Sequence, residues 1–212
     1  TINTSDITAI VDTVGSETLV MSSGTGTLSS ANVNNYFSGN INEGSLTLGD
    51  GTGLASNYTL TGHAASSFQI NQRALNSLGS REYDGTSIAS SSDLTLSNLV
   101  GSDTLILSGN GTVADVNVAV NKTVTVNTLS LADNTGLASN YTLTGGTHQL
   151  NITQRSVTLS GTRSYDGTNT VSNSDLTIGN LAGSETLTLT GAGTVASKDV
   201  GSNKSVTDVS FG

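Results

Sequence analysis

Apolar and polar residues alternate along this chain in short runs with a period of two. Between residues 72 and 153 the runs lie at 74–78, Leu94 and Leu96, Leu105 and Leu107, Val124 and Val126, Tyr141 and Leu143, and Leu150 and Ile152. Side chains of a β-strand point alternately to the two faces of a sheet, so this period predicts half-buried strands. Helix signals are weak because Thr, Val and Gly recur throughout, and we expect at most one helical turn, near residues 31–36.

The same motifs return in the same order along the chain. "VGSETL" at 14–19 returns as "VGSDTL" at 100–105 and "AGSETL" at 182–187, and "GLASNYTLTG" at 53–62 returns unchanged at 136–145. The segment "INQRALNSLGSREYDGT" at 70–86 is matched by "ITQRSVTLSGTRSYDGT" at 152–168, an offset of 82 residues. A repeat of this period indicates tandem structural units.

This repeat divides the chain into three units. Residues 72–153, the central unit, hold every motif. Residues 1–71, the first unit, lack the Tyr-Asp-Gly segment, and residues 154–212, the third unit, stop before a further Ser-Asn-Tyr-Thr-Leu. We therefore expect one complete unit between two partial ones, in a chain that enters its array partway through a unit.

The number and spacing of the runs predict the fold class. About seven short strands in about 80 residues, separated by turn residues, suit a small antiparallel β-sandwich of the immunoglobulin-like type. We predict an all-β protein in which such modules form an elongated array. A β-grasp-like module is the alternative, because a sequence pattern does not fix strand order.

Composition and charge limit the classes of partner. The chain has 16 acidic and 7 basic residues, a net charge of -9, and no Cys. Negative charge repels phosphate backbones, so nucleic acid is not an expected partner. No apolar stretch is long enough to cross a bilayer, so membrane insertion is not expected either. The lack of Cys excludes thiolate nucleophiles and thiolate metal sites.

The Tyr-Asp-Gly-Thr motif, which occurs twice, is the first candidate site. Its residues are Tyr83, Asp84, Gly85 and Thr86 in the central unit and Tyr165, Asp166, Gly167 and Thr168 in the third. Asp-Gly favours a turn, because Gly accepts a positive φ and the Asp carboxylate bonds an N–H group two residues on. The Tyr ring would pack on the core and its hydroxyl would form a hydrogen bond. We interpret the motif as a structural turn, with ligand contact as the alternative.

A second tyrosine follows a turn that contains an acid and a glycine. It is Tyr58 in the first unit and Tyr141 in the central unit, after the turns at 50–53 and 133–136. This order is similar to the region near the sixth strand of immunoglobulin-like sandwiches, where a Tyr hydroxyl bonds upstream backbone. We therefore predict a structural role for both tyrosines.

Groups for metal binding or catalysis are sparse. Oxygen ligands for Ca²⁺ between units could come from five carboxylates, at Asp50, Asp133, Asp103, Glu17 and Glu185. No dense Asp-x-Asp-x-Asp loop is present, so solvated turn carboxylates are the favoured interpretation and no cofactor is required. His63 and His148 stand alone in expected loops, and no Gly-x-Ser-x-Gly elbow occurs. We expect a protein that is not an enzyme.

Three spaced motifs together resemble a known family. The segments are "YDGT", "GSETLTLTGAGTVASKDVGSNKSVTDV" at 183–209 and "GLASNYTLTGGTHQLNITQR" at 136–155. They resemble the YDG repeat modules that occur in tandem in large bacterial adhesins and exoproteins of the filamentous haemagglutinin type. The resemblance implies an extracellular or cell-surface location and a role as a stalk or spacer.

We therefore predict a non-catalytic spacer of a surface adhesin that supports cell adhesion or attachment to a biofilm matrix. Its expected partners are neighbouring units of the same array and a polysaccharide or host surface. One alternative is a glycan- or host-protein-binding module that uses loops such as Tyr36 and Phe37. Another is a subunit that assembles into fibres, because strands of one chain could complete the partial unit of the next.

Overall fold

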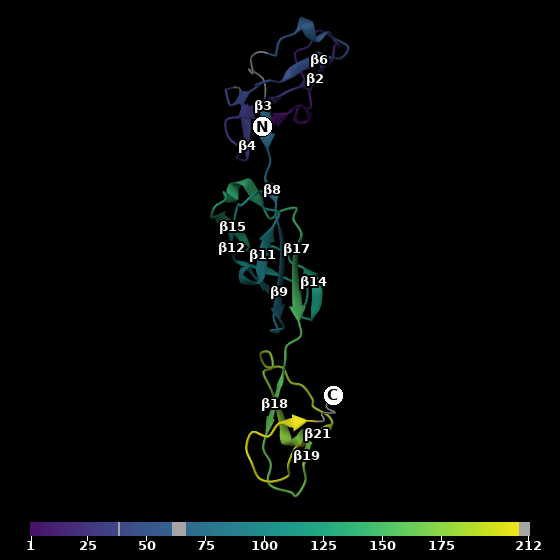
Figure 1. Cartoon of the computed structure of the whole chain (residues 1–212), viewed down its shortest axis with the longest axis vertical. Coiled ribbons are helices and arrows are strands. Elements are labelled where there is room, and N and C mark those ends of the chain that lie inside the picture. The colour runs from purple at the N-terminus through teal and green to yellow at the C-terminus, as the bar shows by residue number, and fades with distance from the viewer. Residues whose placement is uncertain (38, 61–66, 208–212) are drawn as a thin grey trace.

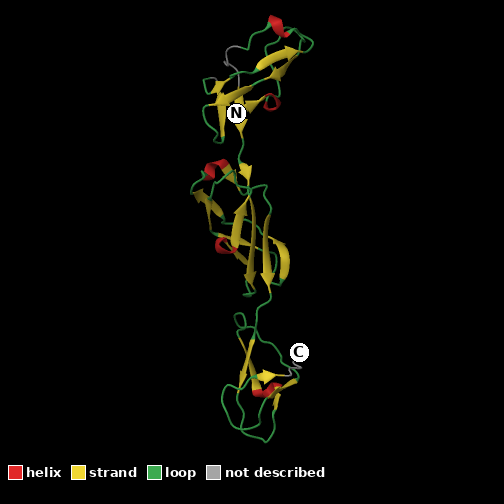
Figure 2. Cartoon of the chain, viewed as in Figure 1, coloured by secondary structure: helices red, strands yellow, loops and turns green. Residues whose placement is uncertain are grey.

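Three small β-units follow one another end to end (Figures 1 and 2). The computed structural model describes residues 1–37, 39–60 and 67–207. Every strand pairing that it contains joins strands of the same unit, and the chain passes between units along single extended segments (Figure 1). No helix within the described ranges is long and apolar enough to span a membrane.

Short strands make up each unit. In the first unit they are β1 (Ile2–Asn3), β2 (Leu19–Ser23), β3 (Thr25–Leu28), β4 (Asn34–Phe37), β5 (Ile41–Asn42), β6 (Thr47–Asp50) and β7 (Ser67–Ile70). In the central unit they are β8 (Arg73–Ala74), β9 (Asn76–Glu82), β10 (Ile88–Ser90), β11 (Leu94–Ser97), β12 (Leu105–Ser108), β13 (Asn110–Thr112), β14 (Ala119–Thr123), β15 (Ser130–Asp133), β16 (Tyr141–Thr142) and β17 (His148–Thr153). In the third unit they are β18 (Thr158–Gly161), β19 (Thr170–Ser172), β20 (Leu176–Gly179), β21 (Ala192–Val195) and β22 (Val206–Thr207).

The helices among the described residues are turns of 3₁₀ type, three residues long. They are η1 (Thr4–Asp6), η2 (Ala55–Asn57), η3 (Ser91–Asp93), η4 (Ala138–Asn140) and η5 (Asn173–Asp175). The helical turn predicted near residues 31–36 is wrong, because residues 34–37 form β4 instead. β4 pairs with β7 and places Tyr36 opposite Phe68, so tertiary pairing overrides a weak local preference.

A four-stranded sheet with the order β11-β9-β17-β14 dominates the central unit. Its two inner strands are parallel, with His148 opposite Ser77 and Thr153 opposite Glu82, and its outer pairs are antiparallel. The prediction of an all-β array with small, mostly antiparallel sheets is confirmed. The parallel pairing of β9 with β17 departs from the purely antiparallel sandwich that the sequence predicts. The strand predicted at Val124 and Val126 lies earlier, because β14 ends at Thr123.

The main core lies in the central unit. Leu75 and Leu150 are fully buried, and Ile152 is 2% exposed. β9 can approach η3 closely because residue 79 is glycine: a Cβ atom there would lie 1.9 Å from the carbonyl oxygen of Asp93. The outer units bury fewer side chains, and in the third unit the most buried apolar residue is Ala182, at 5% exposure, among the residues described there.

Each outer unit contains part of the central pattern. In the first unit, β2 pairs with β6 and β4 with β7, as β12 pairs with β15 and β14 with β17. In the third unit, β18 pairs with β20 and β19 with β21, as β9 pairs with β11 and β10 with β13. The strand pairs of the central unit therefore show which pairs are present in each outer unit and which are not described there.

Candidate junction site at the Tyr-Asp-Gly turn

The Tyr-Asp-Gly motif folds into a turn that its aspartate holds. Asp84 Oδ1 accepts hydrogen bonds from the N–H group of Thr86, at 2.8 Å, and from the Thr86 hydroxyl, at 2.9 Å. Gly85 has a φ of 78°, in the left-handed region that favours glycine. The third unit repeats the turn, with Asp166 accepting from Thr168 at 2.9 and 3.0 Å.

An arginine three residues before the aspartate completes this turn. The guanidinium of Arg81 pairs with Asp84 and donates to the carbonyl oxygen of Thr86 at 2.5 Å, and its side chain is only 8% exposed. Arg163 pairs in the same way with Asp166, at 3.0 Å. Sequence reasoning missed this arginine, although its position relative to the tyrosine is the same in both copies.

These contacts stabilise the charged form of the aspartates. Partial burial alone would raise the pKa of Asp84, but the hydrogen bonds from Thr86 and the Arg81 guanidinium outweigh it and lower that pKa. The pKa of Asp166 is also lowered, chiefly by the hydrogen bond from the Thr168 N–H group. Both turns are therefore held by an ionised carboxylate at neutral pH.

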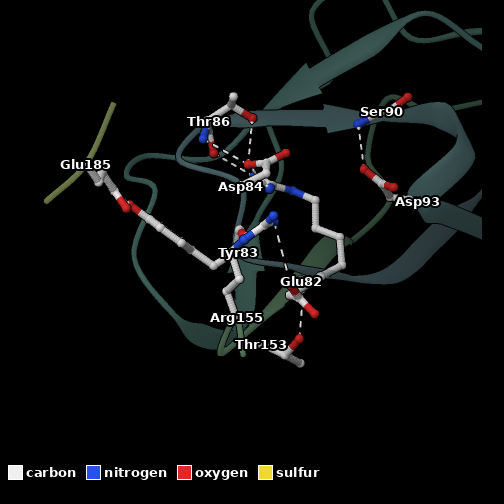
Figure 3. Close-up of polar contacts among 10 residues, drawn as sticks. Glu82, Tyr83, Asp84, Thr86, Ser90, Asp93, Thr153, Arg155 and Glu185 are labelled. Atoms are coloured by element: carbon white, nitrogen blue, oxygen red, sulfur yellow. Dashed lines mark hydrogen bonds and ion pairs between the residues drawn. The ribbon is translucent and has the colours of Figure 1, made fainter. Parts of the chain in front are cut away.

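The tyrosine of the motif reaches the next unit. Tyr83 packs against the central core, and its hydroxyl donates a hydrogen bond to the carboxylate of Glu185 in the third unit (Figure 3). This bond raises the pKa of Tyr83. Tyr165 differs, because it is 61% exposed. The expectation that the motif's tyrosine packs on a core is therefore wrong for Tyr165, whose described neighbours form no core around it.

Arg155 joins the central unit to the third. Its Nε and Nη2 atoms donate to the backbone and side-chain oxygens of Asn180 in the third unit, at 2.6 and 2.8 Å. On the other side, Nη1 donates to the carbonyl oxygen of Tyr83 at 3.4 Å and lies 3.6 Å from the Glu82 carboxylate (Figure 3). One guanidinium thus contacts both units.

The junction between the first and central units uses different residues. Asn140 accepts a hydrogen bond from the N–H group of Val33 at 2.8 Å and donates to the side chain of Asn32 at 2.9 Å. Arg73, the counterpart of Arg155, donates to Asn98 at 2.6 Å within the central unit. The two junctions differ because the first unit has no Tyr-Asp-Gly turn to meet the central unit.

The second pair of tyrosines bonds upstream carboxylates within its own units. Tyr141 is 3% exposed; its hydroxyl donates to Asp103 at 2.5 Å and accepts from the N–H group of Val100 at 3.2 Å. Tyr58 donates to Glu17 and accepts from the N–H group of Val14 at 3.0 Å. The carboxylate partner raises the pKa of each tyrosine.

The carboxylates considered for Ca²⁺ are engaged separately. Asp50 accepts from the N–H group of Ala55 and Asp133 from that of Ala138, each at 2.7 Å, while Asp103 accepts from Tyr141. Within the described ranges, no group of three or more His, Cys, Asp or Glu side chains is placed to hold a metal ion. The structure therefore does not bring these aspartates together.

His148 lies in a strand and not in the expected loop. It belongs to β17 and is 6% exposed. Its Nδ1 atom lies 3.0 Å from the Ser77 hydroxyl and its Nε2 atom 2.8 Å from the carbonyl oxygen of Leu143. Both ring nitrogens are engaged in the core, which indicates a structural role. His63 lies outside the described residues.

Comparison with known proteins identifies the repeat. The family described as YDG domain matches residues 70–150 and 146–211. The first match covers the Tyr83 turn and the second covers the Tyr165 turn and Glu185. No curated protein and no solved structure matches the chain. Since the two matches together span most of the sequence, the chain belongs to the YDG domain family.

Proposed function

We propose that this chain is a non-catalytic spacer, or stalk, of a secreted or surface-exposed bacterial adhesin of the filamentous haemagglutinin type. In this role it supports the attachment of cells to a surface or to a biofilm matrix. One observation carries the proposal: the units lie end to end, and side chains form contacts between the central and third units, from Tyr83 to Glu185 and from Arg155 to the carbonyl oxygen of Tyr83 (Figure 1).

The junction between the central and third units supports a shaft that bends little. β17 ends at Thr153 and β18 begins at Thr158, so few residues separate the two strands. Arg155 lies within this link and bonds both units, and the hydrogen bond from Tyr83 to Glu185 adds a second contact beside it. Short links and contacts between neighbours are typical of arrays that gain length by repetition.

The surface chemistry fits an extracellular spacer better than a dedicated glycan-binding module. Protein sites that bind small ligands are concave and lined largely by apolar and aromatic side chains. Here Tyr36 is 3% exposed, while the exposed rings of Phe37 and Tyr165 belong to different units and form no common platform. A surface rich in hydroxyl groups offers polysaccharide many weak contacts, which add up only through repetition.

Cell-surface display tests the spacer proposal. Residues 1–212 would be placed between an outer-membrane anchor and a single domain that binds a known ligand, beside a version that lacks them. We expect the chain to increase the reach of the binding domain, measured as capture of cells on ligand held beneath a polymer brush. We also expect the isolated chain to bind no member of a glycan array.

Two results would contradict the proposal. One is saturable binding of the isolated chain to a defined glycan or host protein, which would favour a binding module. The other is equal capture of cells on the brush-covered ligand whether or not residues 1–212 separate the anchor from the binding domain. A flexible Gly/Ser linker with the same number of residues is the matched control, because it adds contour length without folded units.

A further inference from the structure

Ala182 of the third unit lies against the Tyr-Asp-Gly turn of the central unit. It is 5% exposed, whereas the residues at the same place in the repeat, Val100 and Val14, are 53% and 72% exposed. A Cβ atom added at Gly85 would lie 3.5 Å from the Cβ atom of Ala182 and 3.9 Å from a carboxylate oxygen of Glu185. Both are ordinary contact distances, so the backbone of the turn at Gly85 packs directly on the third unit.

The surface that receives this turn has the same conformation in all three units. It is a four-residue turn, here called the acid turn, and comprises residues 182–185, 100–103 and 14–17. In each copy the N–H group of the last residue, an acid, donates to the carbonyl oxygen of the first at 3.0–3.1 Å. The second residue is a glycine with a φ of 54–61°. Of these copies, residues 182–185 contact Gly85, so the conformation forms without that contact and is ready for docking.

A clamp fixes the acid turn to the link between the units. Arg155, which lies in the link, holds Asn180 through two hydrogen bonds. The side-chain amide of Asn180 in turn donates to the backbone of the link at 2.7 Å. Arg73 and Asn98 form the same contacts in the central unit. Because Asn180 lies two residues before Ala182, the clamp positions the acid turn beside the link.

The acid of the acid turn adds a directional bond to this packing. The Tyr83 hydroxyl donates to the carboxylate of Glu185 (Figure 3). In the central unit the equivalent acid, Asp103, accepts through Oδ2 from Tyr141 of its own unit. A carboxylate has two oxygens, and each can accept hydrogen bonds. A bond from a docked tyrosine therefore does not exclude a bond from the tyrosine of the acid's own unit.

We propose that the acid turn at 182–185 is the docking surface for the Tyr-Asp-Gly turn of the central unit, and that residue 182 determines how closely the two units approach. Ala182 leaves the backbone at Gly85 room to come into contact. A valine, the residue at positions 14 and 100, adds two methyl groups to a contact that is already closed, and overpacking of this kind forces the parts apart. One small side chain and one glycine thus set the stiffness of the junction.

Distances between spin labels on the two units test this proposal, and they do so whether or not the chain is a spacer. The natural chain has no Cys, so Ser92→Cys and Ser174→Cys can be labelled at equivalent exposed positions of η3 and η5. Pulsed electron paramagnetic resonance on the labelled chain should give a narrow distance distribution. Ala182→Val should broaden it about twofold by separating the two turns. The matched control is Val100→Ala, the reverse exchange at a 53% exposed position, which should not broaden it.

A second pair of variants changes the other side of the contact. Asparagine tolerates a positive φ, so both Tyr-Asp-Gly turns should still form with asparagine in place of their glycine. Gly85→Asn places a longer side chain against Ala182 and should broaden the distance distribution. Gly167→Asn is the matched control, because Gly167 has nearly the same φ, 77°, and no atom within 4 Å of an added Cβ. Amide exchange at Thr86 and Thr168 would verify that the turns remain intact.

Three results would overturn the proposal. A broad distribution in the labelled chain that retains Gly85 and Ala182 would show that the two turns are not docked, even if a variant fails to fold. Unchanged distributions in both Ala182→Val and Gly85→Asn would show that this contact does not set the distance between the units. Equal broadening in each variant and its control would show that the effect does not come from the contact.

Discussion

The central and third units carry nearly the same motifs, but equivalent segments adopt different structures in them. Residues 105–108 form β12, whereas the equivalent residues 187–190, "LTLT", form no strand. In the central unit β12 pairs with β15, and the described part of the third unit contains no counterpart of β15. The same sequence pattern is therefore a strand only where a partner is present.

The first unit shows the same effect at its other end. Residues 94–97 form β11 beside β9, whereas residues 7–11, "ITAIV", form no strand. The first unit has no segment that corresponds to β9. Strand preference depends on cross-strand packing more than on the residue itself, so the alternating pattern is necessary for a strand but not sufficient.

We expect the largest effect on stability when a buried side chain is removed from β17, one of the two paired inner strands of the central unit. Leu150→Ala should destabilise the central unit by about 2–5 kcal/mol, because Leu150 is fully buried. Phe68→Ala, at the equivalent half-buried position of the first unit, should cost that unit less. Hydrogen exchange measured by unit would resolve the two effects, since the units need not unfold together. If the two variants lost equal stability, the pairing of β9 with β17 would contribute little to the stability of the central unit.

A smaller effect is expected at the junction. Tyr83→Phe removes the hydrogen bond to Glu185 and should increase the angular spread between the central and third units. Small-angle scattering or residual dipolar couplings would measure that spread. Tyr165→Phe is the matched control, because Tyr165 is 61% exposed and contacts no further unit within the described chain. If both variants behave like the natural chain, the tyrosine does not hold the junction.

We expect the smallest effect from pH, on the stability of the two Tyr-Asp-Gly turns. The pKa values of Asp84 and Asp166 are lowered in the folded state, so both contribute stability that is fully present above the unfolded pKa of about 4. That stability is lost as pH falls through the lower folded pKa. Amide exchange at Thr86 and Thr168, corrected for the intrinsic rate, should therefore show less protection at pH 3 than at pH 6.

Asparagine variants are the control for this pH dependence. Asp84→Asn and Asp166→Asn have no carboxylate to titrate, so protection in their turns should be lower at neutral pH and should change little between pH 6 and pH 3. A natural chain whose turns keep the same protection at both pH values would show that the hydrogen bonds, and not the ionised carboxylates, hold them.

The sequence predicts the class of fold better than the contacts between units. Alternation and the 82-residue offset indicate small β-units in tandem because both depend on local residue order. The parallel pairing of β9 with β17 joins segments more than 60 residues apart, and no local pattern encodes it. The bond from Tyr83 to Glu185 spans 102 residues and was missed for the same reason.

The parallel pairing of β9 and β17 determines how a unit responds to tension. The chain enters the central unit just before β9 and leaves it just after β17, and the two strands lie side by side from Ser77 and His148 to Glu82 and Thr153. A force that separates the chain ends pulls these neighbouring strands past each other along their length. The hydrogen bonds between them are then loaded in shear, all at once, and not opened one by one as in a peeled hairpin. An array of such units resists extension through backbone geometry, with no need for the covalent cross-links that cysteine would provide.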